Sequence, residues 1–331
     1  MARRTLTARD VLDATSFHGA RALLAAASLG VFEALAGRRA TPGAVARRIA
    51  CDPAATERLL NVLLGMRLLE QEGKKVRLAP GARDLLTDAG SLSLSDLLRH
   101  RAARFKAWAL LEDSIRTGRP VVLAGEGEED LLALQAARAR RDSARRWAPV
   151  VAAWIDLGDV RSLLLLGDGP AVYAHHFARA RPKMQITVLD TPASVSVGRD
   201  YLRGRAEARR VKLVAGNPVR DGLPRGRFDA AFLCDALHAY SLENSRRLLR
   251  RVKKALRPKG LLLVRDRFLD DRGPGPLENS LYDLQLLLAT REGRCHSVRE
   301  ASDAVRAAGF RSVVVRDPGL ADDERVITGT A

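Results

Sequence analysis

The turn Gly167-Asp168-Gly169 and the acid Asp190 have the residue types and the spacing of a nucleoside-binding site. The turn follows four leucines at positions 163–166, which indicate a buried parallel strand, and a helical pattern follows it. Glycines let the backbone approach a ligand, and the start of the helix behind them favours the ligand's negative end. A second apolar run, 185–189, ends at Asp190, about twenty residues after the turn, where an acid typically binds a ribose. The pattern predicts nucleoside binding; the alternative is a turn that only closes a strand–helix unit.

The elements that must position this site follow from alternating apolar runs. Strands are predicted at 162–166, 185–189, 211–214, 228–233 and 261–264, with helices between them. Two short strands near the end of the chain, 311–315 and 325–328, are close enough in sequence to pair antiparallel. The sequence therefore predicts an α/β fold with a Rossmann-like, doubly wound, seven-stranded sheet that includes an antiparallel terminal hairpin.

A different pattern precedes this region. Apolar residues recur at helical spacing over 7–35, and Thr41-Pro42 and Asp52-Pro53 are helix starts with a cap followed by proline. Helices at 42–49 and 53–66 and a hairpin broken at Gly73 complete a winged-helix arrangement. A helix that reads DNA should present several base-contacting side chains, whereas the second helix is mostly apolar. A packing or dimerisation module is the favoured interpretation.

The middle of the chain is predicted to be helical. Residues 91–117 and 130–154 carry apolar stripes, and Pro149 is expected to kink or break the second helix. The predicted domains are a winged-helix dimerisation domain at 1–100, linking helices at 101–160 and a Rossmann-like domain at 161–331.

The net charge of +17 raises the possibility of nucleic-acid binding. However, only 8 of the 56 basic residues are lysine, and the arginines are spread along all 331 residues. This spread is typical of a compositional bias with solvated helix faces, so nucleic acid is the minority interpretation.

Cysteine and histidine usage predicts no metal site. The three cysteines and six histidines show no metal-ligand spacing, and an odd, scattered set of cysteines fits a reducing cytoplasm. The apolar stretch 22–35 is interrupted by Ser28, Gly30 and Glu33, so neither a signal peptide nor a membrane span is expected.

The order of elements resembles the class I S-adenosylmethionine-dependent methyltransferases. More narrowly, it is similar to small-molecule O-methyltransferases of the caffeate and acetylserotonin type and their bacterial relatives, over nearly the whole chain. The motifs that carry the resemblance are Leu166-Gly167-Asp168-Gly169-Pro170, Val188-Leu189-Asp190, Ala215-Gly216-Asn217, Leu237-His238-Ala239-Tyr240, Leu256-Arg257-Pro258-Lys259-Gly260 and Ala307-Ala308-Gly309-Phe310.

The resemblance implies a set of cofactor-binding residues. Gly167 and Gly169 would lie against the methionine part of S-adenosylmethionine, Asp190 would hold the ribose hydroxyls, and Asn217 would meet the adenine amino group. Asp168 and Cys234 complete the implied cofactor set.

The resemblance also implies the catalytic residues. His238 matches the general base that takes a proton from the acceptor hydroxyl, and Asp266 matches a carboxylate that orients this histidine. The residues implied to line the acceptor pocket, or else to be plain core, are Phe105, Trp108, Tyr282 and Leu286.

Four positions depart from the family pattern. Leu165 stands where an acid is usual at the end of the first strand, and Ala171 stands at the last glycine of the loop. Asn217 replaces an acid, and Cys295 falls where a second carboxylate often flanks the base.

The sequence thus predicts an S-adenosylmethionine-dependent O-methyltransferase for a small aromatic or polyketide-like hydroxyl, which forms a homodimer through its N-terminal domain. The four departures keep a second hypothesis open, in which the fold and the dimer remain but cofactor binding is lost or repurposed. A winged-helix DNA-binding regulator is the third.

Overall fold

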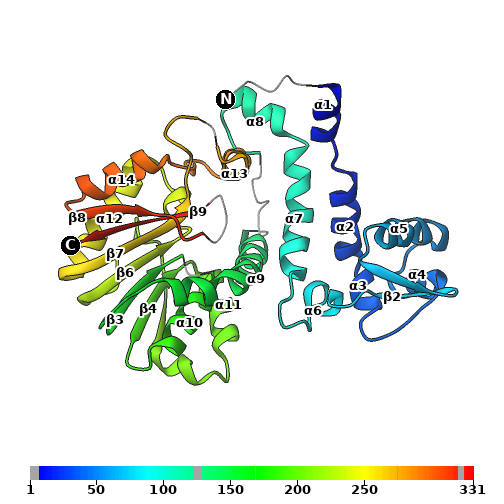
Figure 1. Cartoon of the computed structure of the whole chain (residues 1–331), viewed down its shortest axis with the longest axis horizontal. Coiled ribbons are helices and arrows are strands. Elements are labelled where there is room, and N and C mark those ends of the chain that lie inside the picture. Colours follow the sequence, from blue (N-terminus) through cyan, green and yellow to red (C-terminus); the bar gives the residue numbers. More distant parts are fainter. Residues whose placement is uncertain (1–6, 122–128, 168, 274, 320–323) are drawn as a thin grey trace. The chain divides into compact units, whose positions relative to one another are not determined.

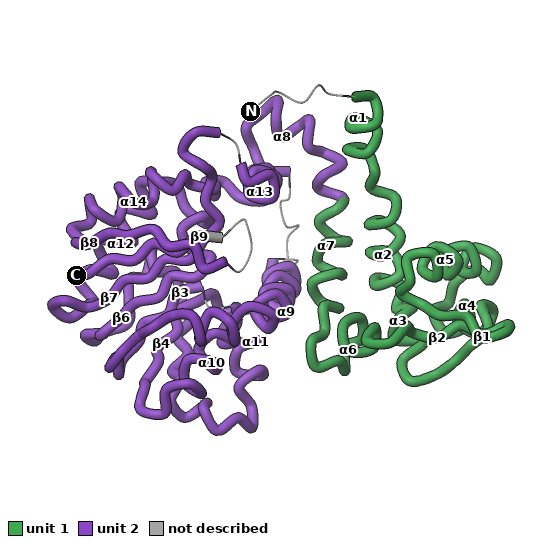
Figure 2. Tube along the Cα trace, viewed as in Figure 1, with its two compact units in different colours: residues 1–105 green, residues 106–331 purple. Residues whose placement is uncertain are grey.

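The computed structural model describes residues 7–121, 129–167, 169–273, 275–319 and 324–331. The chain divides into two compact units, Met1–Phe105 and Lys106–Ala331 (Figure 2). The first is helical with one small hairpin, and the second is built on a seven-stranded sheet (Figure 1). The three-part division into 1–100, 101–160 and 161–331 stays a prediction.

The N-terminal unit is the predicted winged-helix arrangement. Its helices are α1 (Ala8–Ala14), α2 (His18–Leu29), α3 (Val31–Ala34), α4 (Pro42–Arg48), α5 (Pro53–Gly65) and α6 (Ala82–Leu86), followed by α7 (Ser95–Trp108), and its antiparallel hairpin is β1 (Leu69–Glu72) and β2 (Lys75–Leu78). The predicted continuous helical stretch 7–35 is instead three helices, because the chain leaves helical geometry after α1 and again at Gly30, whose φ is 78°.

Helix caps in this unit lie where the sequence places them. The Thr41 side chain accepts from the amide of Ala44, the Asp52 carboxylate accepts from the amide of Ala55 at 2.8 Å, and a proline follows each cap. These caps satisfy amides that the first helical turn leaves unpaired.

The helices that lead into the second unit differ from the prediction in two ways. The stretch 91–117 is not one helix, since α7 ends at Trp108 and α8 (Leu111–Thr117) follows. Helix α9 (Glu129–Trp154) continues through Pro149, so the predicted break is wrong. Pro149 is exposed, and on that side of the helix solvent can bond the carbonyl that the proline leaves without a donor.

The sheet of the second unit is doubly wound, as predicted. Its strands are β3 (Ser162–Leu166), β4 (Gln185–Asp190), β5 (Val211–Ala215), β6 (Phe228–Cys234), β7 (Leu256–Arg267), β8 (Arg311–Arg316) and β9 (Glu324–Thr330). The strand order is β5-β4-β3-β6-β7-β9-β8. The first five strands pair in parallel, and β9 pairs antiparallel with both β7 and β8, which is the predicted terminal hairpin.

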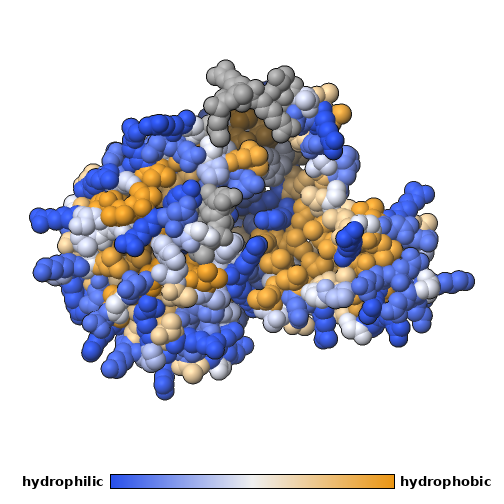
Figure 3. Space-filling model, in the orientation of Figure 1, coloured by the Kyte–Doolittle hydropathy of each residue, from blue (hydrophilic) through white to orange (hydrophobic). Residues whose placement is uncertain are grey.

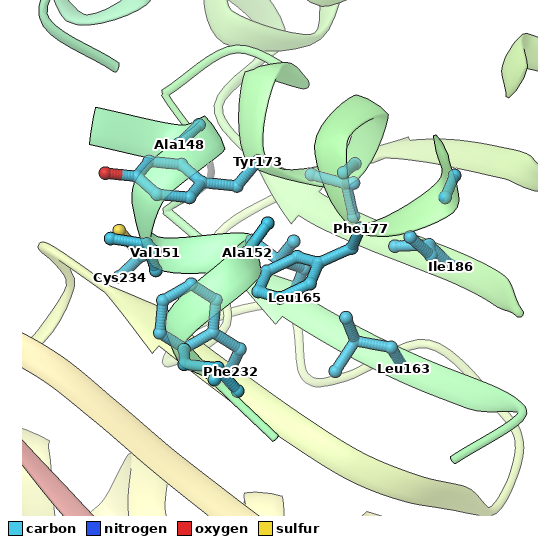
Figure 4. Packing of buried hydrophobic residues seen from close by; sticks show 14 of the residues in the cluster. Ala148, Val151, Ala152, Leu163, Leu165, Tyr173, Phe177, Ile186, Phe232 and Cys234 are labelled. Carbon is cyan, nitrogen blue, oxygen red and sulfur yellow. The ribbon is translucent and has the colours of Figure 1, made fainter. Parts of the chain in front are cut away.

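The four leucines of β3 explain why helices cover both faces of this sheet. Leu163 and Leu165 pack with α9 and with α10 (Val172–Ala180), whereas Leu164 and Leu166 pack with α12 (Leu242–Ala255) and α14 (Val298–Ala307). Successive side chains of a strand point to opposite faces, so an unbroken apolar run needs a layer on each side. Figure 4 shows Leu165 among Phe177 and Phe232 in the first of these layers.

The strand register brings three loops together at the carboxyl-terminal edge of the sheet, where its parallel strands end. Leu166 of β3 is level with Leu189 of β4 and with Leu233 of β6. The chain leaves β3 for β4 on one side and reaches β6 on the other, so this edge is a topological switch point. The residues that follow these strands are therefore neighbours, which is where such sheets bind ligands.

At the opposite, amino-terminal ends of the strands, Asp229 links the start of β6 to the start of β3 through hydrogen bonds. Its Oδ2 accepts from the amides of Arg161 and Ser162 at 3.0 and 2.9 Å and from the Ser162 hydroxyl at 3.0 Å, and Arg257 pairs with Oδ1. Burial raises the pKa of Asp229, but the bonds from Arg257, Arg161 and Ser162 outweigh it and the pKa is lowered. A lowered pKa means stabilisation that is present above about pH 3.9, the unfolded value, and lost as the pH falls through the folded value.

We therefore expect Asp229→Asn to destabilise the protein by about 1–2 kcal/mol at pH 7, because four donors lose a charged acceptor. Urea denaturation at pH 7 and at pH 3 should give a difference from wild type that shrinks at the lower pH. Asp303→Asn, which alters an exposed pair with Arg306, is the control and should change stability little. An equal difference at both pH values would contradict this account.

Candidate active site

The glycine turn after β3 is closely packed. Gly167 has a φ of 73°, and a Cβ there would lie 2.3 Å from the carbonyl oxygen of Cys234 at the end of β6. A Cβ on Gly169 would lie 2.6 Å from the Cβ of Ala144 in α9. Only glycine permits both the left-handed backbone and this approach. Asp168 lies outside the described residues.

Asp190 ends β4 beside this turn and has unused hydrogen-bonding capacity. Its Oδ1 accepts from the amide of Thr191 at 2.7 Å, whereas its Oδ2 is buried and has no hydrogen-bond partner among the described residues. Because a buried carboxylate oxygen without a donor is costly, the position suits a ligand that brings hydroxyl groups. The residues at this edge therefore fit a ribose.

Asn217 follows β5, where Ala215 is level with Asp190. Its Oδ1 accepts from the amides of Val219 and Arg220 at 2.9 and 3.0 Å, so the side-chain oxygen closes its own turn. The side chain is thus held in one orientation by the local backbone.

His238 and Asp266 form a buried pair. His238 lies in the short 3-10 helix η2 (Leu237–Ala239) after β6, and Asp266 lies near the end of β7. The imidazole Nδ1 is 2.6 Å from Asp266 Oδ1, while Asp266 Oδ2 accepts from the amides of Leu237 and His238 at 2.8 and 3.2 Å. An ionised carboxylate only accepts, so we assign the Nδ1 proton to this bond, which leaves Nε2 as the acceptor nitrogen.

The Nε2 atom already faces a phenol. The hydroxyl of Tyr282, on α13 (Leu277–Ala289), lies 3.0 Å from Nε2, and the two rings meet edge to face with centroids 5.1 Å apart. The Arg267 guanidinium lies 5.0 Å from the centre of the Tyr282 ring. Burial raises the pKa of Tyr282, so its hydroxyl remains a donor at neutral pH.

Burial and charge act in opposite directions on the histidine. Burial lowers the pKa of His238, but the charge of Asp266 and its hydrogen bond outweigh burial, and the net pKa is raised. Burial raises the pKa of Asp266, but the charge and the hydrogen bond of His238 lower it by more than burial raises it. The net pKa of Asp266 is therefore lowered. Compared with the unfolded chain, the folded state therefore stabilises the imidazolium beside the Asp266 carboxylate. This stabilisation is full below about pH 6.5, the unfolded value for histidine, and is lost as the pH rises through the raised pKa. The neutral imidazole with Nε2 as acceptor is the form present above the raised pKa.

A second buried histidine holds the loop of the first. His296 Nε2 lies 3.3 Å from the carbonyl oxygen of Leu237 and 3.3 Å from the hydroxyl of Ser245. Burial lowers the pKa of His296, so it is neutral at pH 7 and can donate one proton to this backbone oxygen. His296 thus contacts the backbone of the loop that carries His238, a contact that the sequence analysis does not predict.

Across the described ranges, the structure brings together no group of three or more His, Cys, Asp or Glu side chains that could hold a metal ion. None of the helices in the described part of the chain combines the length and the apolar content that a bilayer crossing requires.

Comparison with known families decides the relationship. Residues 118–311 match the O-methyltransferase domain, and residues 13–88 match the O-methyltransferase dimerisation domain. The first match alone covers more than half of the chain. The chain belongs to the O-methyltransferase family. The resemblance drawn from the sequence motifs is thereby confirmed.

Individual relatives agree with this placement. The chain is 28% identical over 317 residues to the tetracenomycin polyketide synthesis 8-O-methyl transferase TcmO of Streptomyces glaucescens, covering 92% of this chain and 91% of that protein. It is 30% identical to bovine acetylserotonin O-methyltransferase, covering 92% and 93%. The crystal structure of human N-acetylserotonin methyltransferase in complex with SAM superposes with a TM-score of 0.85 at 25% identity, covering 100% and 99% of the two chains.

Two of the residues predicted to line the acceptor pocket lie on α13, in the same unit as His238. Tyr282 contacts His238, and Leu286 is buried one turn further along α13. Phe105 and Trp108 lie on α7, where Phe105 has its ring 6.1 Å from that of Phe17. Their part in an acceptor pocket stays a prediction.

The departures from the family pattern have local explanations. Leu165 is fully buried in the apolar layer beside α10, and Ala171 keeps the left-handed backbone of the glycine it replaces, with a φ of 63°. Burial raises the pKa of the Cys295 thiol to about 12, so this residue carries no charge near neutral pH and does not act as a carboxylate. The sequence analysis also missed Asp235 and Arg265, although an arginine at the end of an apolar strand is an unusual signal.

We expect Asp266→Asn to lower the pKa of His238 below its ordinary value of about 6.5, because burial, the largest effect, is then opposed only by the weaker charge of Asp235. NMR titration of histidine-labelled protein measures this shift directly. His175 is the internal control, since Arg205 and Glu207 set its environment, and its titration should be unchanged. A His238 pKa that stays raised in the variant would assign the shift to another group.

Proposed function

We propose that this chain is an S-adenosylmethionine-dependent O-methyltransferase that acts on a hydroxyl of a small aromatic or polyketide-like molecule, with His238 as the general base. One observation carries the proposal. Asp266 holds Nδ1 of His238, and Nε2 accepts a hydrogen bond from the phenol of Tyr282 at 3.0 Å. An imidazole in this state can accept the proton of a phenolic hydroxyl at the same position.

In this proposal, Nε2 of His238 takes the proton of the acceptor hydroxyl, which leaves an oxygen anion. S-adenosylmethionine would supply the methyl group on its sulfonium: as the O–CH3 bond forms the S–CH3 bond would break, and its electron pair would stay on the sulfur of the departing S-adenosylhomocysteine. Asp266 stabilises the imidazolium that forms, because its charge is buried 2.6 Å from Nδ1. Tyr282 donates a hydrogen bond to Nε2 before the acceptor arrives and then to the acceptor oxygen.

We assign cofactor binding to the edge formed by Gly167, Gly169 and Asp190. Asp190 Oδ2 would accept hydrogen bonds from the ribose hydroxyls. Because Gly167 and Gly169 have no side chains, the backbone of the glycine turn would make the remaining contacts with the cofactor. Asn217 follows β5 and Cys234 ends β6, the strands on either side of β4 and β3. The relative solved in complex with SAM supports this choice of cofactor.

A homodimer through the N-terminal unit is part of the same proposal. Large apolar side chains are exposed on this unit, and its surface in Figure 3 carries hydrophobic residues among hydrophilic ones. The exposed side chains include Val11, Leu12, Phe17, Leu29, Val62 and Met66. An exposed apolar set of this kind, within a region that matches a dimerisation domain, fits association with a second copy.

We expect His238→Ala to slow methyl transfer by about a hundredfold to ten-thousandfold, the contribution of a general base. Activity toward a phenolic acceptor is measured with radiolabelled S-adenosylmethionine. Affinity for S-adenosylhomocysteine, measured by calorimetry, should stay within about twofold, because His238 does not contact the proposed nucleoside site. Unchanged turnover would remove His238 from the role of base.

We expect Asp190→Asn to weaken S-adenosylhomocysteine binding by about tenfold to a hundredfold, because a charged acceptor for two hydroxyls becomes neutral. Asp200→Asn, on the exposed side of α11 (Pro192–Leu202), is the matched control and should bind like wild type. If wild-type protein binds no S-adenosylhomocysteine at millimolar concentration, the protein is a family member that has lost the cofactor, which is the alternative function.

A further inference from the structure

A buried arginine lies beneath the active-site edge. Arg265, near the end of β7, is 2% exposed and is level with Cys234 of β6. Its Nη1 lies 3.1 Å from Asp235 Oδ2 and 3.3 Å from Cys234 Sγ, and its guanidinium lies 5.7 Å from the centre of the Tyr173 ring. Burying a guanidinium is costly unless an acid compensates its charge, and Asp235 does so here.

The acid that it holds is strained and exposed. Asp235 has a φ of 52°, a left-handed conformation that is unfavourable for an L-residue, and its amide donates to the carbonyl of Arg265 at 2.9 Å. Its side chain is 42% exposed, and no described group bonds its Oδ1. Residues kept in sparsely populated conformations by their surroundings cluster at functional sites.

The position of Asp235 relates it to both halves of the proposed site. The preceding residue, Cys234, packs its carbonyl oxygen against Gly167, so Asp235 adjoins the glycine turn. The base His238 is three residues further along the same loop. The negative charge of Asp235 raises the pKa of Tyr282, although burial raises it more. The same charge raises the pKa of His238, although Asp266 raises it more. The electrostatic field of Asp235 therefore extends to His238.

We infer that the Asp235 carboxylate, held in place by Arg265, binds an ammonium group of a ligand at this edge. Arg265 binds Oδ2 of the Asp235 carboxylate. The strained backbone sets the direction of the other oxygen, Oδ1, which is available to a cationic donor. The carboxylates that the family pattern would place at Leu165 and Cys295 are absent, and Asp235 supplies a negative charge from a different strand end. The inference rests on the proposed function, because it assigns a ligand group to the same site.

Two ligands of the proposed reaction can bring an ammonium group. S-adenosylmethionine carries one on its amino-acid part, and an acceptor can carry an amine beside its phenol. The recognition chemistry is the same, a charge-assisted hydrogen bond to Asp235, and paired probes that differ in the ammonium separate the two sources.

The first arm is calorimetry with S-adenosylhomocysteine and with 5′-methylthioadenosine, which lacks the amino-acid part. If Asp235 holds the cofactor ammonium, Asp235→Asn should weaken S-adenosylhomocysteine at least about tenfold and leave methylthioadenosine within about twofold. The second arm compares tyramine with 4-ethylphenol, which differ by the ammonium. If the acceptor supplies the group, Asp235→Asn should weaken tyramine selectively.

Controls keep the test decisive. Asp303→Asn, an exposed acid of the same unit, should change none of the four affinities, and an unchanged thermal midpoint shows that Asp235→Asn folds normally. Equal effects of Asp235→Asn within both probe pairs, or no effect in either, would overturn the inference. A wild-type protein that binds neither nucleoside would instead refute the proposed cofactor, and the tyramine arm would still decide the role of Asp235.

Discussion

The buried carboxylate of Asp266 is the constraint on which the site depends. It receives the imidazole of His238 and the amides of Leu237, His238 and Arg267, the last at 2.8 Å. Because a buried anion is stable only when donors surround it, these groups are held together as a set. The carboxylate therefore fixes the tautomer of His238, the shape of the loop that carries it and the spacing of β6 and β7 at this edge.

The sheet places this constraint beside the glycine turn. Four buried leucines hold β3 between two helical layers, and the parallel register makes β3, β4 and β6 end together. The turn, Asp190 and the loop after β6 consequently share one edge, although they are far apart in sequence. A shift of one residue in the register would turn each leucine of β3 toward the opposite layer, so the core and the site are fixed by the same pairing.

The parts of the structure that the sequence predicts are those governed by local pattern. The caps at Thr41 and Asp52, the apolar strands and the terminal hairpin depend on neighbouring residues, and the structure contains them. The continuity of α9 through Pro149 depends on solvent exposure, which local pattern does not reveal. The pairing of His238 with Asp266 spans 28 residues, and only the family resemblance indicated it. The Asp235–Arg265 pair depends on which residue of β7 is level with Cys234, and no sequence motif indicates that register.

Neighbouring residues of β7 explain how one loop can present two kinds of polar group. Arg265 and Asp266 are adjacent in a strand, so their side chains point to opposite faces of the sheet. Arg265 pairs with Asp235 on the face of α10, and Asp266 pairs with His238 on the other face. The short loop 235–238 is thus held from both faces of the sheet, with its acid Asp235 bound to Arg265 on one face and its histidine His238 bound to Asp266 on the other. These two contacts fix the exposed carboxylate of Asp235 and the buried imidazole of His238 relative to each other.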